Sequence, residues 1–132
     1  MSLQVLVNEK DKGIFVIEPV GEVNTQTYQE LENKVNAAIQ SGAQAIAFEL
    51  KGMSYISSMG LSVFFRAKQR LEKNGGTIAL VNLQPQIKTI FETVKVLPDQ
   101  MFASLEQADE YLDSFLDGVQ KGRITPKNPS GF

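Results

Sequence analysis

Short apolar segments of strand length alternate along this chain with longer segments whose apolar residues recur at helical spacing. The first two strand-like segments, Leu3–Val7 and Ile14–Val20, flank Asp11-Lys12-Gly13, which is typical of a hairpin turn. The later strand-like segments are Ala45–Leu50, Thr77–Val81 and Met101–Ala103. A helical segment precedes each of these later strands and another follows the last, so the order predicts an α/β domain with a mixed, mostly parallel sheet of about five strands and right-handed crossovers.

About four α-helices are expected to pack against this sheet. The first follows a cap at Asn24 or Thr25 and ends at Ser41-Gly42, and the second runs from about Ser58 to Asn74, where Gly75-Gly76 follows. The third starts at Pro85 and is closed by Leu97-Pro98-Asp99, and the fourth starts at Ser104. Their apolar stripes are Tyr28, Leu31, Val35 and Ala38; Leu61, Phe64, Ala67 and Leu71; Ile87, Ile90, Phe91 and Val94; and Leu105, Ala108, Leu112, Phe115 and Leu116.

A chain of 132 residues can bury one hydrophobic core and little more, so a single domain is expected over residues 1–118. The segment 119–132 contains two Pro and two Gly without any apolar periodicity. Such a composition cannot bury enough apolar surface to offset its conformational entropy. We therefore expect a disordered C-terminal tail.

The chain contains no Cys and no His, which excludes the usual zinc ligand sets and the Cys-His and Ser-His-Asp nucleophile systems. Catalysis would have to use carboxylates, lysines or hydroxyls alone, so a non-enzymatic protein without a cofactor is expected. A net charge of −2 gives no electrostatic reason to bind nucleic acid or an anionic membrane. With no signal peptide and no apolar run of about 18 residues, a cytoplasmic protein is expected.

Two adjacent serines, Ser57 and Ser58, stand where a short loop leads from a strand into the second helix. The first amides of a helix lack partners within it, and the helix dipole is positive there, so a phosphate on Ser58 would be stabilised. Phosphorylation would add a charge of roughly −1.5 to −2 to the surface without unfolding the domain. The same serines also suit plain helix capping, and local chemistry alone leaves both interpretations open.

The segment Tyr55-Ile56-Ser57-Ser58-Met59-Gly60-Leu61 resembles the signature of STAS domains, the anti-sigma factor antagonists of bacterial partner-switching systems. The family pattern is a hydrophobic residue, Asp, Ser, Ser or Thr, Gly and Leu. Ile56, Ser58 and Gly60-Leu61 match it, whereas Ser57 replaces the Asp and Met59 replaces the second hydroxyl. With Gly21-Glu22, Gly75-Gly76 and the element order, the resemblance covers about residues 3–117.

The resemblance implies that the unmodified chain binds an anti-sigma factor that is also a serine kinase. Phosphorylation of Ser58 would prevent this binding, and a phosphatase would restore it. The implied partner-binding residues are Asn24, Thr25, Ser57, Ser58, Met59 and Gly60. Of the adjacent Phe64 and Phe65, one is expected in the core, and the other is a candidate aromatic anchor for the partner. The oligomeric state, monomer or dimer, stays open.

Two other functions are compatible with a chain of this kind. STAS domains also serve as constitutive scaffolds in signalling assemblies or lipid-transport complexes, and the departures at Ser57 and Met59 fit that role. A small enzyme or a receiver-like phosphoacceptor would need acidic residues at the ends of its first and third parallel strands, where this sequence has Glu22 and Lys51-Gly52. The acids of the last helix, Glu106, Asp109, Glu110 and Asp113, are expected on a solvated face rather than around a metal.

Overall fold

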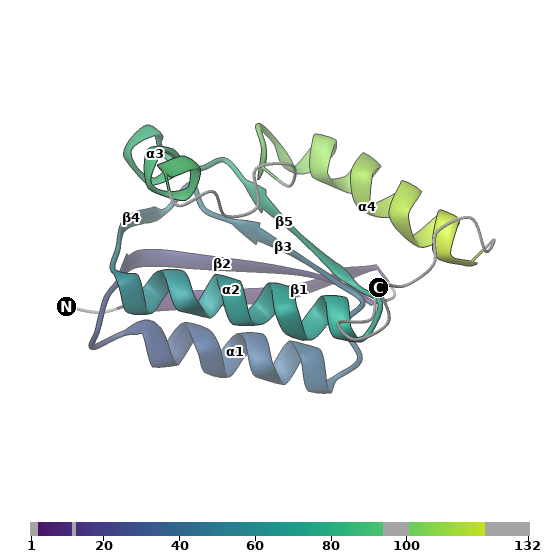
Figure 1. Ribbon diagram of the computed structural model, residues 1–132, viewed down its shortest axis with the longest axis horizontal. Helices are drawn as coiled ribbons and strands as arrows, with labels where there is room; N and C mark the ends of the chain where they lie inside the picture. Colours follow the sequence, from purple (N-terminus) through teal and green to yellow (C-terminus); the bar gives the residue numbers. More distant parts are fainter. Residues whose placement is uncertain (1–2, 12, 94–100, 121–132) are drawn as a thin grey trace.

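A computed structural model describes residues 3–11, 13–93 and 101–120 (Figure 1). In this part of the chain, six strands and four helices follow one another as β1 (Leu3–Asp11), β2 (Ile14–Val23), α1 (Tyr28–Gln40), β3 (Ala45–Glu49), β4 (Met53–Ile56), α2 (Ser58–Lys73), β5 (Thr77–Val81), α3 (Pro85–Thr93), β6 (Met101–Phe102) and α4 (Leu105–Gln120). The predicted single α/β domain with an initial hairpin is confirmed.

The strands form one mixed sheet in the order β1-β2-β3-β5-β6, in which β1 is antiparallel to β2 and the other pairs are parallel. β2 is long enough to pair with two strands in succession. Its first half, Ile14–Ile17, pairs with β3, and its last residues, Gly21–Val23, pair in parallel with β4. β3 and β4, which follow each other in the chain, therefore lie one after the other along the same side of β2.

The sequence prediction missed β4 and ended β2 too early, at Val20. Gly21 was taken as the end of the strand, but it adopts φ +122° and lies at a register irregularity with β4, so it bends β2 instead of ending it. In β4, Met53 and Ile56 are buried while the two residues between them are exposed. That spacing does not show the period of two by which a half-buried strand is recognised.

Helices cover the sheet on both faces (Figure 1). α1, α2 and α3 pack on one face, over the large side chains of the core. α4 packs on the other, where Ala45, Ala47 and Ala79 of β3 and β5 meet Ala108 and Leu112. Because both faces are covered, all five residues of each of these two central strands are buried, as is usual for parallel sheets.

Three phenylalanines form the centre of the larger core. Phe64 of α2 packs edge-on against Phe48 of β3, with ring centroids 4.8 Å apart, and against Phe91 of α3, at 5.5 Å. All three side chains are fully buried, whereas the neighbouring Phe65 is 43% exposed. The expectation that one of the two adjacent phenylalanines enters the core is confirmed.

Several expectations fall outside the described residues. They concern Val94, Leu97-Pro98-Asp99 and residues 121–132, and the side chains of Asp109, Phe115 and Leu116. The domain limit at residue 118 stays a prediction, although α4 extends to Gln120. Among the described helices, none combines the length and the apolar character that a membrane span requires.

The contrast between the two phenylalanines gives a matched test of the core. Phe64→Ala removes a fully buried ring and leaves a cavity, so it should lower the free energy of unfolding by about 3–5 kcal/mol. Phe65→Ala removes a ring of the same size from a half-exposed position and should change it by less than about 1 kcal/mol. Urea unfolding followed by circular dichroism measures both, and equal losses would contradict the assignment.

Candidate functional site

The start of α2 gives different roles to the two adjacent serines. Ser57 is the N-cap, with extended φ −94° and ψ 175°, and its Oγ accepts a hydrogen bond of 3.2 Å from the backbone N–H of Gly60. Ser58 is the first helical residue, and its exposed side chain has no hydrogen-bond partner among the described residues. Capping is therefore performed by Ser57, which leaves the hydroxyl of Ser58 free for other chemistry.

Gly60 brings this helical turn into close contact with the end of β2. A Cβ atom there would lie 2.8 Å from the carbonyl oxygen of Val23 and equally close to the side chains of Val23 and Ile56. The backbone N–H of Ser57 also donates to the Val23 carbonyl, at 2.9 Å. These contacts fix the first turn of α2 against the sheet, so the exposed position of Ser58 is set by the fold.

The loop after β2 lies at the same end of the molecule, because the Val23 carbonyl that precedes it binds Ser57. Asn24 Oδ1 accepts hydrogen bonds from the backbone N–H groups of Gln26 and Thr27, at 2.9 and 3.0 Å. Thr27 Oγ1 donates to the carbonyl of Glu22 at 2.6 Å. These bonds order the loop while Thr25, at its tip, stays exposed.

The expected cap of α1 at Asn24 or Thr25 is wrong, because the N-cap position is Thr27. Asn24 uses its side-chain oxygen to close the turn before the helix instead. An Asn followed by polar residues suits an Asx turn and an N-cap equally well, and the sequence does not distinguish the two. The structure nevertheless brings Asn24 and Thr25 to the end of the sheet where Ser57 and Ser58 lie.

Exposed apolar side chains accompany Ser58. Met59 is 38% exposed, and Phe65 lies seven residues after Ser58, on the same side of α2. Tyr55, in the strand that leads to the site, is 49% exposed. Sequence reasoning did not single out Tyr55, because it had assigned this strand to a loop. After the switch expected at Ser58, we call the surface formed by Asn24, Thr25, Ser57, Ser58, Met59 and Phe65 the switch surface. Gly60, which was also expected to bind the partner, is buried and does not belong to it.

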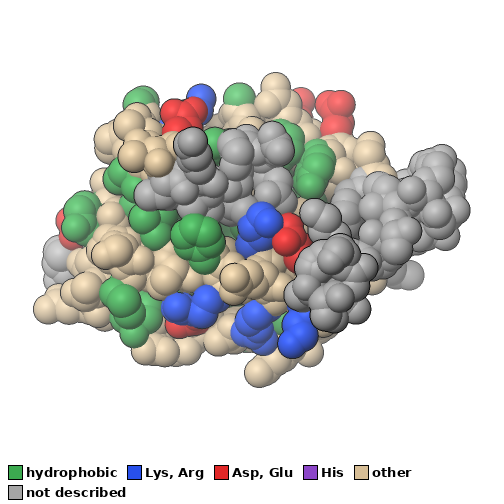
Figure 2. Space-filling view, viewed as in Figure 1, with side chains coloured by type: hydrophobic (Ala, Val, Ile, Leu, Met, Phe, Trp, Pro, Cys, Tyr) green, Lys and Arg blue, Asp and Glu red, His purple; other side chains and the backbone are tan. Residues whose placement is uncertain are grey.

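Charge is distributed unevenly over the helical face (Figure 2). Lys and Arg side chains gather over the middle and later parts of α1 and α2, and hydrophobic side chains are more frequent toward the end where these helices begin. Arg66 of α2 forms an ion pair with Glu32 of α1, and Arg70 donates to Asn36. The hydrogen bond that Arg66 Nε donates to the Glu32 carboxylate raises the pKa of Arg66 above its ordinary value. These contacts join α2 to α1 along their length.

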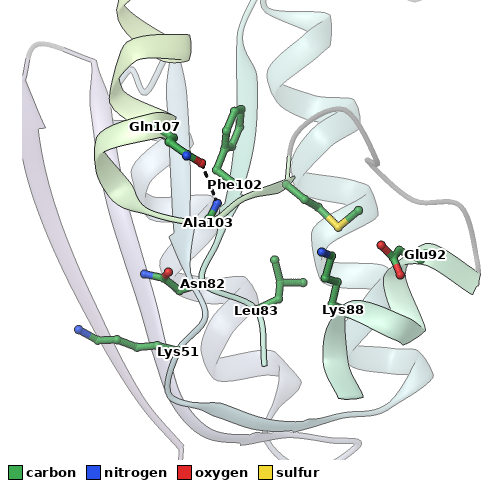
Figure 3. A pocket seen from close by; sticks show the side chains of 9 residues that line it. Lys51, Asn82, Leu83, Lys88, Glu92, Phe102, Ala103 and Gln107 are labelled. Carbon is green, nitrogen blue, oxygen red and sulfur yellow. Dashed lines mark hydrogen bonds between the residues drawn. The ribbon is translucent and has the colours of Figure 1, made fainter. Parts of the chain in front are cut away.

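A cleft of about 750 Å³ opens elsewhere, at the carboxyl end of β5 (Figure 3). It is lined by Asn82 and Leu83 after β5, by residues of α3 and by the chain around β6. Beside it, the buried carboxylate of Glu49 accepts hydrogen bonds from Asn82 Nδ2, at 3.0 Å, and from the backbone N–H of Lys51, at 3.1 Å. None of the predicted site residues lines this cleft.

Glu49 is thus a strand-end carboxylate that sequence reasoning did not consider. Its two hydrogen bonds join the ends of β3 and β5, so its role in the fold is to fix the loop that leads to β4. In the described part of the chain, no cluster of acidic residues could hold a metal ion.

Residues 6–108 match the family model described as the STAS domain. The anti-sigma F factor antagonist of Lysinibacillus sphaericus is 28% identical over 104 residues, which are 78% of this chain and 89% of that protein. An anti-sigma factor antagonist from Mycobacterium paratuberculosis superposes with a TM-score of 0.77 at 20% identity, over 85% of this chain and 95% of the other. SpoIIAA, a Bacillus cell fate determinant, superposes in its phosphorylated form with a TM-score of 0.68 at 21% identity, over 82% and 98%. These two solved structures show the shared fold.

The cap at Ser57 can be tested by two substitutions. Ser57→Ala removes the oxygen that accepts from Gly60, so it should lower the free energy of unfolding by about 0.5–2 kcal/mol. Ser57→Asp keeps an acceptor and adds a negative charge at the positive end of the helix, so stability should be retained or raised by about 0.3–1 kcal/mol. Urea unfolding measures both.

Ser62 provides the control, because its Oγ donates to the carbonyl of Met59 and caps no free amide. Ser62→Ala should change stability by less than about 0.5 kcal/mol. A Ser57→Ala variant as stable as the unmodified protein would show that the cap does not stabilise α2.

Proposed function

Because this chain belongs to the STAS domain family, we propose that it is an anti-sigma factor antagonist, a regulator that acts by binding a protein partner. The relative from Lysinibacillus sphaericus bears that name. The proposed partner is an anti-sigma factor that is also a serine kinase. It phosphorylates Ser58, and a phosphatase removes the phosphate. The role is binding in the cytoplasm rather than catalysis, and it requires no cofactor, nucleic acid or membrane.

The observation that carries this proposal is the position of Ser58. Its hydroxyl is exposed and takes no part in the fold, because the neighbouring Ser57 performs the capping. The backbone N–H groups of Ser58 and Met59 have no hydrogen-bond partner among the described residues and lie at the positive end of α2. A phosphoryl group on Ser58 would therefore be tolerated by the domain and would change chiefly its surface.

The switch surface around Ser58 suits a protein partner. Met59 and Phe65 present half-exposed apolar side chains, and Thr25 adds a polar group from an ordered loop. Large apolar anchors with a polar rim are typical of binding hot spots. A dianion placed between them at Ser58 would have to be desolvated when the partner binds, which opposes association.

Binding to an anti-sigma factor kinase from the same genome tests the switch. Ser58→Ala should bind with an affinity within about threefold of the unmodified chain, because the exposed side chain makes no hydrogen bond to the described residues and the change adds no charge. Ser58→Asp should bind at least about tenfold more weakly, since it puts a charge inside the interface. Isothermal titration calorimetry measures both affinities.

Ser114→Asp is a matched control, because it places the same charge at an exposed serine of α4, on the opposite face of the sheet. Its affinity should equal that of the unmodified chain. Equal affinities for Ser58→Ala and Ser58→Asp would overturn the proposed switch, although a partner could still bind.

The residue before Ser58 favours a second candidate function. Ser57 stands where the family pattern has an acid. Its hydroxyl can cap the helix as that acid would, but it carries no negative charge. In our hypothesis, the charge of the acid helps a partner kinase to position its substrate. A chain that is never phosphorylated would act as a constitutive scaffold in a signalling assembly or a lipid-transport complex. Both functions use the same fold.

Intact mass after incubation with the kinase and ATP separates the two functions. The proposed switch requires a mass increase of one phosphoryl group that is absent from Ser58→Ala, and Ser57→Asp should be modified faster. A chain that binds the kinase but gains no mass acts as a scaffold. Transfer of phosphate to Ser57 in place of Ser58 would contradict the assignment of the site.

A further inference from the structure

The outer edge of β1 ends the sheet. β1 spans nine residues and pairs only with β2, and within the described ranges no other strand lies against its far side. A free edge of this length presents backbone N–H and C=O groups that can pair with another chain. Proteins usually protect such edges with charged residues, proline or a bulge.

The central part of β1 lacks this protection. Residues Gln4–Asn8 include no charge and no proline, and the charged residues of the strand are confined to its hairpin end, where the register irregularity also lies. Leu6 and Val7 are 47% and 41% exposed. Val20 of β2 lies on the same face as Leu6, diagonally across the pair, and is 37% exposed.

The described side chains of α4 do not pack on this region. The cluster under α4 takes in Ile14 and Val16, from the first part of β2, and includes neither Leu6 nor Val20. The uncovered apolar side chains therefore sit beside the free edge, where a further strand would extend over them.

We propose that β1 pairs with β1 of a second copy of this chain, antiparallel, around a two-fold axis at Leu6. In this register Leu6 faces its own copy, Val5 faces Val7, and Gln4 faces Asn8, so apolar residues meet apolar ones and polar residues meet polar ones. An axis at Val7 would instead place Leu6 against Asn8 and Val5 against Glu9. The sequence of the edge is thus self-complementary in one register, as a two-fold interface requires.

The pairing would join two sheets into one and gather Leu6 and Val20 of both copies on the face that α4 leaves open. It involves no residue of the switch surface, so each copy would keep its own site for a partner. The inference does not depend on the proposed function, and its test requires no partner.

Sedimentation equilibrium of the full chain, from about 10 µM to about 500 µM so that mass action favours association, should show a monomer–dimer equilibrium. Leu6→Lys and Leu6→Glu each place like charges opposite one another at the axis and should weaken the dimer at least about tenfold. An equimolar mixture of the two variants should restore dimers, since Lys then faces Glu. This rescue is specific to an axis at Leu6.

Tyr55→Lys provides the control, because it replaces a comparably exposed residue on β4, outside both β1 and the switch surface, and should leave dimerisation unchanged. Circular dichroism of each variant confirms that it is folded. An unmodified chain that stays monomeric at the highest concentration would overturn the proposal. So would dimers of Leu6→Lys as strong as those of the unmodified chain, or a mixture of variants that fails to associate.

Discussion

The fold depends on the backbone of β2, which pairs first with β3 and then, further along, with β4. At the step between those strands, the N–H of Gly21 donates to the carbonyl of Gly52, at 2.9 Å. At the end of β2, the carbonyl of Val23 accepts from Ser57 and lies close to Gly60. One strand therefore sets the place of β4, the direction in which α2 leaves the sheet and the exposure of Ser58.

Much of the fold could be predicted because its central strands and helices obey simple periodicities. β3 and β5 are mainly apolar runs with one polar residue each and are buried on both faces, and the stripe of α2 contains Phe64 at the centre of the core. The part that could not be predicted depends on long-range pairing. β4 is a strand because β2 lies beside it, and its four residues carry no periodicity of their own. In the sequence, Gly21 looks like the end of a strand. In the sheet, β2 continues through it with a positive φ and a shift of register against β4.

The site was predictable in its residues but not in their roles. The motif located Ser57 and Ser58 correctly at a helix start, and the family match agrees with the resemblance. Which of the two serines caps the helix depends on which of them has extended backbone angles. Ser57 has them, with ψ 175°, and the sequence does not reveal this. The exposure of Met59 and Phe65 and the burial of Glu49 likewise depend on which face of each element meets the core.

The separation of roles between Ser57 and Ser58 has a consequence for protein turnover. A cell degrades proteins largely through their unfolded fraction, which depends on the free energy of unfolding. The hydroxyl of Ser58 makes no hydrogen bond within the described fold, so a phosphoryl group attached to it would break none and, at the positive end of α2, would leave that free energy unchanged or slightly raised. A molecule modified at Ser58 would then be degraded no faster than an unmodified one, so modification by itself would not deplete the pool.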